Sequence, residues 1–149
     1  MAAAAKHKDL QLVLSVGAYL DPEQIGPLPS SAIIVRHAPQ SELLKRASAC
    51  ITHAGSNTVL EALANGVPQV AIPVTHDQPG VAARVAAKKT GLVVPLQELT
   101  PLPPLLDQVL NDSIYRENAR YFQKVIAHKN GLSVAVDVLE QAFGLRESQ

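Results

Sequence analysis

The stretch from Cys50 to Gln78, CITHAGSNTVLEALANGVPQVAIPVTHDQ, limits the possible folds of this chain more than any other segment. Its apolar start predicts a short strand that ends at Thr52, and the small residues that follow predict a tight turn. A helix is expected from about Asn57 to Asn65, because Gly66 is typical of a helix end. The apolar run from Val70 to Val74 predicts a second buried strand. Strand, helix and strand in this order form the unit of an α/β fold with a parallel sheet.

Polar turns follow both of these strands. The first, His53 to Ser56, leads into the helix, so unpaired backbone N–H groups and the positive end of the helix dipole face the turn. Gly55 lets the backbone approach a ligand where a side chain would block it. The second turn, Thr75 to Gln78, should meet the first in one crevice, because open α/β sheets bind ligands at the carboxyl ends of their strands. These residues alone indicate a phosphate-containing ligand.

A larger set of residues, taken with its spacing, carries a family resemblance. The set is His37-Ala38-Pro39-Gln40, His53-Ala54-Gly55-Ser56-Asn57, Glu61, Gly66-Val67-Pro68, Pro73 and Asp77-Gln78. It resembles the donor-binding signature of UDP-glycosyltransferases with the GT-B fold. The likeness is greatest to bacterial members that glycosylate macrolides and other lipophilic acceptors, including carotenoids. The coarse pattern continues to about Phe143.

The resemblance implies roles for the first turn and its helix. His53 would reach the diphosphate of the donor, and the backbone of Gly55 to Asn57 would hold phosphate oxygens. Glu61 would accept hydrogen bonds from two ribose hydroxyls. The plainer alternatives are that His53 only packs beside the helix and that Glu61 only complements the helix dipole. In either case, Ser56 or Asn57 is expected to cap the helix.

The resemblance also implies sugar and base contacts. Asp77 and Gln78 would hold sugar hydroxyls, and a carboxylate beside an amide suits a polyhydroxylated ligand; alternatively, Asp77 only caps a helix. His37 stands where many relatives carry a tryptophan that stacks on uracil, so base selectivity should be weaker. Gln40 is expected at the base edge or simply as the first residue of a helix. The family pattern gives His76 no fixed role.

Two other kinds of site fit the same residues less well. His53, His76 and Asp77 are types that bind zinc, but no i, i+4 pair or second cluster supports them, so we expect no metal site. The family generally uses no protein-bound metal and no cofactor beyond the UDP-sugar itself. Gly55-Ser56 could begin a hydrolase nucleophile elbow, but Thr58 stands where the second glycine belongs.

Composition excludes several other classes of protein. The 149 residues suffice for one domain with a core. Thirteen basic and thirteen acidic residues, with no tryptophan, argue against a nucleic-acid binder. No run is apolar and long enough to span a bilayer, and Met1 to Lys6 lacks a signal-peptide layout. Cys50, the single cysteine, is expected to be a small buried residue, and a chain without a disulfide fits a reducing cytoplasm.

The rest of the chain predicts alternating strands and helices, followed by helices alone. The expected strands outside the central stretch are Leu10 to Val16, covered on both faces, Ala32 to Val35 and Leu92 to Val94. The expected helices are Ala2 to Lys8, one turn within Asp21 to Pro29, Gln40 to Ala47, Asp77 to Lys89 with Gly91 as its stop, Thr100 to Leu110, Asp112 to His128 capped by Asp112 or Ser113, and Ser133 to Phe143 with Val134, Val138 and Leu139 inward. This order predicts a Rossmann-like parallel sheet with helices on both faces and a helical C-terminal end.

The resemblance implies that residues 1–149 form a single donor-binding domain, one half of a GT-B enzyme. The strand that opens such a domain is missing, and so is the acceptor half with the catalytic base. The whole enzyme would move a hexose from a UDP-sugar to a hydroxyl of a lipophilic acceptor with inversion, and its donor residues indicate glucose. The isolated chain would be inactive. Two alternatives remain open. One is the soluble donor-binding subunit of a split N-acetylglucosamine transferase with a membrane-bound partner. The other is a UDP-sugar epimerase or a non-catalytic nucleotide-sugar binder.

Overall fold

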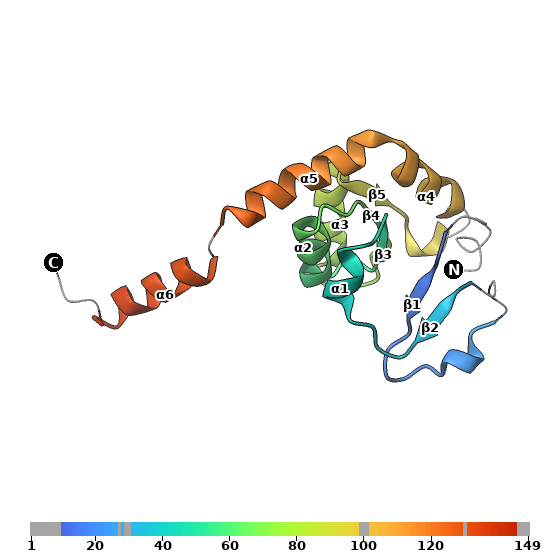
Figure 1. Ribbon diagram of the computed structural model, residues 1–149, viewed down its shortest axis with the longest axis horizontal. Helices are drawn as coiled ribbons and strands as arrows, with labels where there is room; N and C mark the ends of the chain where they lie inside the picture. Colours follow the sequence, from blue (N-terminus) through green and yellow to red (C-terminus); the bar gives the residue numbers. More distant parts are fainter. Residues whose placement is uncertain (1–9, 27, 29–30, 99–101, 130, 146–149) are drawn as a thin grey trace.

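The computed structural model describes residues 10–26, 28, 31–98, 102–129 and 131–145, which form a body of strands and helices with one helix set apart (Figure 1). Two expectations lie outside these residues: the helix at Ala2 to Lys8 and the helix start at Thr100-Pro101. Within the described part, strands and helices alternate up to β5 and helices follow, as predicted.

The described strands are short and pair only in parallel. They are β1 (Val13–Ser15), β2 (Ile33–Val35), β3 (Cys50–Thr52), β4 (Gln69–Ala71) and β5 (Gly91–Val93). Parallel pairs join β1 to β2, β3 to β4 and β4 to β5. Across β3, β4 and β5, Gln69 lies between Cys50 and Gly91. Continuous apolar runs in the sequence are typical of such sheets, because helices cover both faces.

The five strands form two separate ladders, β1–β2 and β3–β4–β5. Within the described residues no strand joins the two ladders, so they do not form one continuous five-stranded sheet. One detail of the prediction is wrong: Leu10 to Val16 is not covered on both faces, since only Leu14 of this stretch is buried.

The predicted helices are confirmed, with shifts at their ends. They are α1 (Gln40–Leu44), α2 (Ser56–Ala64), α3 (Gln78–Ala87), α4 (Leu102–Asn111), α5 (Ser113–Ala127) and α6 (Gly131–Ala142), with short 3-10 turns η2 (Pro22–Gln24) and η3 (Leu96–Glu98). Asp112 caps α5, because its carboxylate accepts a hydrogen bond from the backbone N–H of Ile114 at 3.1 Å. α1 stops short of Ala47 because its last turn tightens into i to i−3 hydrogen bonds, the last from Ala47 N–H to the Leu44 carbonyl.

The end of α3 differs from its prediction in an informative way. Gly91 does not stop the helix; Lys89 does, with a left-handed φ of 49°. Gly91 instead begins β5, where a Cβ would lie 2.0 Å from the carbonyl oxygen of Gln69 on the neighbouring strand. The glycine is therefore needed for the close approach of two backbones. Gly66 does end α2 as predicted, with a φ of 67°.

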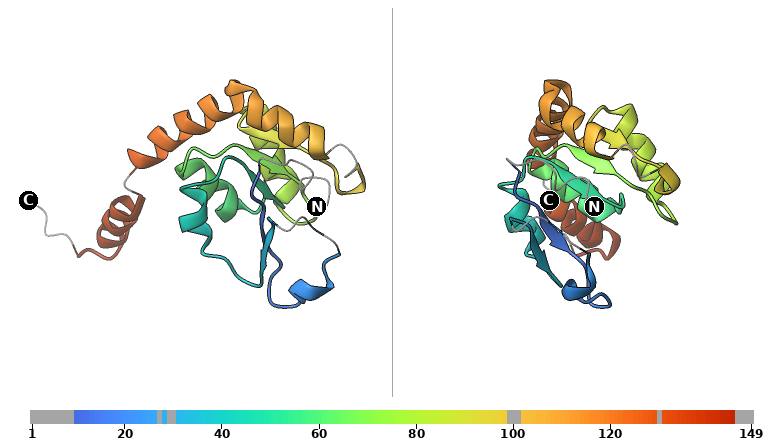
Figure 2. Two further views of the ribbon diagram at one scale, coloured as in Figure 1. Left: turned by 45° about the vertical axis from the view of Figure 1, so that its right-hand side comes forward. Right: turned by 90° about the vertical axis from the view of Figure 1, so that its right-hand side faces the viewer.

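The core lies on both faces of the β3–β4–β5 sheet. Successive strand residues point to opposite faces, and Val70 and Ala71 illustrate this. Val70 belongs to a cluster with Leu102 and Leu106 of α4, whereas Ala71 belongs to a second cluster with Val85 of α3 and residues of α2. Helices thus cover both faces, which confirms the predicted fold class. Figure 2 shows α4 and α5 arching over the body and α6 lying beyond the end of α5.

Helix α6 contradicts the sequence prediction for its apolar face. Val134, Val138 and Leu139 were expected to point inward, but they are 59%, 59% and 55% exposed. The helix leaves the body after α5 and contacts none of the other helices closely (Figure 1). Periodicity correctly predicts an apolar stripe on a helix, but it does not say whether the same chain covers that stripe.

Candidate functional site

The candidate site lies where two neighbouring parallel strands end and two helices begin. β3 and β4 are paired, with Thr52 opposite Ala71, so the segments after them leave the same edge of the sheet. The segment after β3 leads into α2, and the segment after β4 leads into α3. α2 and α3 also contact each other. The structure therefore brings both polar turns to one edge, as the sequence predicts.

The N-terminus of α2 has no side-chain cap. Gly55 is the N-cap residue, with φ −61° and ψ 134°, and no side chain accepts from the first turn. The prediction that Ser56 or Asn57 caps this helix is therefore wrong, because both already lie inside its first turn. The first backbone N–H groups of a helix have no partner within it. Left uncapped and near the surface, they form a site for an anion.

The turn before α2 is strained and tightly built. Ala54 is fully buried and has a left-handed φ of 64°, which costs an L-residue about 1–2 kcal/mol. Its N–H donates to Thr52 Oγ1 at 3.2 Å, which helps to hold that conformation. The ring of His53 lies over Gly55, since a Cβ there would come within 2.6 Å of His53 Nε2. Gly55 thus makes room for the imidazole, and His53 remains exposed at the surface.

A hydrogen bond joins Gln40 to Glu61, from segments that are distant in the sequence. Gln40 is the first residue of α1, and its Nε2 donates to Glu61 Oε2 at 2.8 Å. The same Nε2 lies 3.5 Å from Thr58 Oγ1, also on α2. His37, in the connection between β2 and α1, is exposed. The structure therefore brings the segment of Gln40 against α2, the helix that follows the first polar turn.

The second turn is held by a side chain of the site itself. Gln78 Oε1 accepts from the backbone N–H groups of Val74 and Thr75, at 2.9 and 3.0 Å. Asp77 occupies the N-cap position of α3, but its side chain makes no capping hydrogen bond. His76 is exposed and has a left-handed φ of 58°. The plain alternative for Asp77, a helix cap, is therefore not what its carboxylate does in this structure.

Sequence reasoning missed some parts of this site. Thr58 was not singled out, although it lies beside Gln40, and only the fold brings the two together. The left-handed conformation of Ala54 carries no signal in its own residue type. Among the described residues, no hydrogen bond or ion pair joins the side chain of His37 or Asp77 to another candidate residue. The described part of the chain also has no group of three or more His, Cys, Asp and Glu residues placed to hold a metal ion.

Known proteins resemble this chain in sequence and in fold. Residues 11–136 match the family model described as UDP-glucoronosyl and UDP-glucosyl transferase. The "Uncharacterized UDP-glucosyltransferase YojK" of Bacillus subtilis (strain 168) is 32% identical over 139 residues, covering 92% of this chain and 34% of that protein. The solved structure of CalG4, the calicheamicin glycosyltransferase, is 32% identical with a TM-score of 0.83, covering 90% of this chain and 36% of that one. Glycosyltransferase VinC, solved in complex with dTDP, is 28% identical with a TM-score of 0.79, covering 93% and 36%.

The fold thus defines this chain as part of a GT-B glycosyltransferase architecture, with the uncapped N-terminus of α2 at one edge of its sheet. More particularly, the chain belongs to the UDP-glucoronosyl and UDP-glucosyl transferase family. It spans about a third of the length of the curated relatives that it matches. Of the helices in the described part, none combines the length and the apolar character needed to cross a membrane.

Proposed function

We propose that this chain is the donor-binding half of a glycosyltransferase that moves glucose from UDP-glucose to a hydroxyl of a lipophilic acceptor, with inversion. The observation that carries the proposal is the first half of α2. This one helix offers an uncapped N-terminus to an anion and, one turn later, a carboxylate that Gln40 holds in place. A nucleoside diphosphate presents the two matching groups, a diphosphate for the helix N-terminus and a ribose diol for the carboxylate.

The diphosphate would lie at the α2 N-terminus. The N–H groups of the first turn, together with the positive end of the helix dipole, would hold the phosphate oxygens. His53 would donate to the same group from its place over Gly55. Negative charge grows on UDP as the bond to the sugar breaks, so donors fixed before the reaction stabilise the transition state. His53 and the first turn of α2 would therefore assist the departure of UDP as well as bind it.

The ribose would lie against Glu61. A carboxylate can accept from two neighbouring hydroxyls at once. The hydrogen bond from Gln40 occupies only part of the capacity of Oε2 and leaves Oε1 for the diol. Gln40 would thus orient Glu61 rather than reach the base edge, and His37 would lie nearer the base. The exposed imidazole offers a smaller stacking surface than an indole, in keeping with a site that accepts more than one base.

The sugar would lie against Asp77 and Gln78. The side-chain oxygen of Gln78 is engaged by the turn, so its Nε2 remains as a donor. The exposed carboxylate of Asp77 supplies acceptors beside it. A hexose hydroxyl both donates and accepts, so this pair can hold two neighbouring hydroxyls in a fixed orientation. This arrangement suits glucose and also closely related hexoses, and the solved complex of VinC with dTDP makes thymidine donors the alternative to test.

The acceptor half would pack against α6. This helix exposes a row of large apolar residues that nothing in the described body covers, with Leu132 and Leu139 at 80% and 55%. An exposed apolar surface of this kind is typical of an interface. In an enzyme that joins this chain to an acceptor half, Leu132→Gln with Leu139→Gln should lower activity while leaving the stability of the isolated chain unchanged. Unchanged activity of the joined enzyme would remove this interface from the proposal.

The proposed reaction can be tested directly. The isolated chain, incubated with radiolabelled UDP-glucose and a lipophilic alcohol, should give no glycoside, because the base that deprotonates the acceptor belongs to the other half. Joined to an acceptor half, it should give a product whose anomeric configuration is inverted, which NMR can establish. Efficient turnover by the isolated chain would contradict the proposal. The epimerase alternative gains no support from the relatives, whose names are those of glycosyltransferases.

A further inference from the structure

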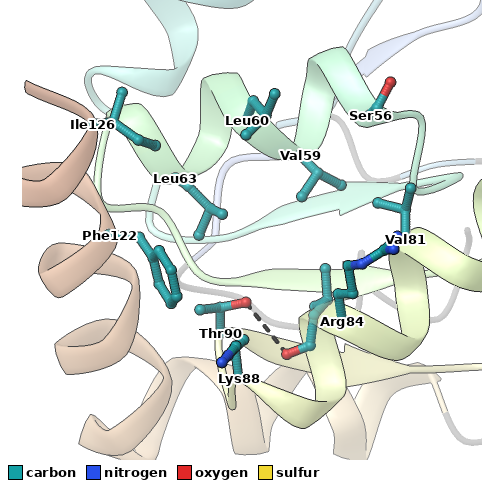
Figure 3. A pocket seen from close by; sticks show the side chains of 11 residues that line it. Ser56, Val59, Leu60, Leu63, Val81, Arg84, Lys88, Thr90, Phe122 and Ile126 are labelled. Atoms are coloured by element: carbon teal, nitrogen blue, oxygen red, sulfur yellow. Dashed lines mark hydrogen bonds between the residues drawn. The ribbon is translucent and has the colours of Figure 1, made fainter. Parts of the chain in front are cut away.

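An apolar groove runs between α2, α3 and α5, beside the polar crevice rather than within it (Figure 3). Its volume is about 460 Å³. Its apolar lining comes from all three helices: Val59, Leu60 and Leu63 of α2, Val85 of α3, and Phe122 and Ile126 of α5. A volume of this order lies within the range of small-molecule sites, which are mostly apolar with a few polar groups.

The groove is distinct from the candidate donor site. Ser56 is the one candidate donor residue among those that line it. Figure 3 shows Ser56 at one end of the groove and the side chains of Phe122 and Ile126 at the other. Leu60, a large apolar residue that lines the groove, is 56% exposed. The groove therefore calls for an apolar occupant that the nucleotide-sugar does not supply.

Two cations border this apolar surface. Arg84 of α3 and Lys88, the C-cap residue of this helix, stand one turn apart and both line the groove. Figure 3 shows the guanidinium of Arg84 extending toward Val81 and the amino group of Lys88 pointing the other way. Both are exposed. Within the described residues, neither forms an ion pair. Two positive charges without a nearby anion attract an anionic group, and the apolar floor beside them attracts a hydrocarbon chain.

We propose that this groove binds an amphipathic acid, with its hydrocarbon chain along α2 and α5 and its carboxylate at the cationic border to which Arg84 and Lys88 belong. The proposal goes beyond the transfer reaction and does not depend on the donor site. A second copy of this protein fits less well, because a stable dimer needs a total buried surface of about 1,200 Å² or more. A concave groove of this size accepts a hydrocarbon chain more readily than it accepts the flat face of another protein. The charge of the border selects an acid over a neutral lipid.

Three probes with the same hydrocarbon chain separate the contributions: dodecanoate, dodecanol and dodecyltrimethylammonium, each kept below its micelle concentration. Titrations followed by amide chemical shifts should show saturable binding of dodecanoate, with the largest shifts in α2 and α3. Dodecanol should bind several-fold more weakly, and the ammonium probe weakest of all. Shifts that are absent from the groove, or equal affinities for the three probes, would overturn the proposal.

Variants at exposed positions test the same site without removing core residues. Arg84→Glu with Lys88→Glu should weaken dodecanoate binding about tenfold or more, because a hydrogen-bonded charge pair is lost and repulsion replaces it. Arg46→Glu, an exposed arginine outside the groove, is the matched control and should have no effect. Leu60→Gln should weaken dodecanoate and dodecanol alike and leave UDP binding unchanged. Unaltered dodecanoate affinity in the charge variant, or a dimer through the groove that dodecanoate does not dissociate, would overturn the proposal.

Discussion

The two ladders of the sheet differ sharply in how well they are covered. We call residues 10–40 the open half and residues 50–127 the packed half. In the packed half Val70, Ala71 and Val94 are fully buried, and helices lie on both faces of the strands. In the described part of the open half, Leu14 alone is buried. Similar apolar runs therefore end in different surroundings, because burial of a strand depends on what pairs with it and lies over it.

This difference divides the candidate donor site. The phosphate and sugar turns belong to the packed half, where strands, turn and helix fix each other. His37 and Gln40 belong to the open half. The hydrogen bond from Gln40 to Glu61 is the polar side-chain link between the two groups of candidate residues in the described structure. We therefore expect the phosphate side to be preorganised and the base side to depend on that link.

The largest expected effect is a loss of stability in the packed half. Gly91→Ala would place a Cβ 2.0 Å from the Gln69 carbonyl oxygen and 2.7 Å from its carbon, both backbone atoms of β4. The β4–β5 pair cannot remain in place, so the free energy of unfolding should fall by about 4 kcal/mol or more. Gly26→Ala, in the open half, meets nothing within 4 Å and should change it by less than about 0.5 kcal/mol. Urea unfolding measures both variants, and equal midpoints would contradict the comparison.

Cys50 provides a pH test of the packed half. This thiol packs against the cluster of Leu44, Ala62 and Val67, but Cys50 is only partly buried, so the expected burial is met in part. Burial raises the pKa of Cys50 from 9.0 to about 11. Below pH 9 both folded and unfolded chains keep the proton; above it the unfolded chain loses the proton first, so stability falls as pH rises from 9 to 11.

The size of this fall is on the order of 3 kcal/mol, from 1.36 kcal/mol for each pKa unit. Other groups titrate in the same range, so the difference between the wild type and Cys50→Ser isolates the thiol. The wild type should lose more stability than the variant between pH 9 and pH 11 in denaturant unfolding. Parallel curves for the two proteins would show that the thiol is not buried as described.

The smallest expected effect concerns the hydrogen bond from Gln40 to Glu61, which links the two halves. Gln40→Ala removes the hydrogen bond to Glu61, so UDP affinity should fall about fivefold, equivalent to about 1 kcal/mol. Stability should hardly change, because Gln40 is exposed. Gln24→Ala, an exposed glutamine of η2 in the open half, is the matched control and should bind UDP normally. If Gln40→Ala binds UDP like the control, the link has no role in the donor site.

Local patterns in the sequence predicted much of the fold. The apolar runs and the helix stop at Gly66 placed the end of β3, both ends of α2 and the start of β4 within one residue, because the signals are local. The predicted end of the second strand at Val74 is wrong, since β4 ends at Ala71. The end of α3 was predicted wrongly, since Gly91 is explained by a neighbouring strand and not by the helix before it. The exposure of α6 could not be predicted either, because an apolar face looks the same whether this chain or another part of a protein covers it.

The candidate site was predictable residue by residue but not as a set of contacts. Polar residues after two strands identified His53 and Asp77, because parallel strands end at one edge. The hydrogen bond between Gln40 and Glu61 joins residues 21 positions apart and arises from the packing of α1 on α2. The helix groove was also missed, because its apolar lining residues look like ordinary core positions in the sequence, and a groove between three helices exists only when all three are in place.

Calorimetric titration of the chain with UDP tests the central claim most directly, with UDP-glucose and dTDP beside it and with His53→Ala and Glu61→Ala as variants. His53 is exposed and Glu61 is partly exposed, so both variants should stay folded, which circular dichroism can check. We predict saturable UDP binding by the wild type, weakened about tenfold or more in each variant through the loss of charge-assisted hydrogen bonds. A folded wild type that binds none of these nucleotides, or equal UDP affinities in all three proteins, would contradict a donor site at the α2 N-terminus.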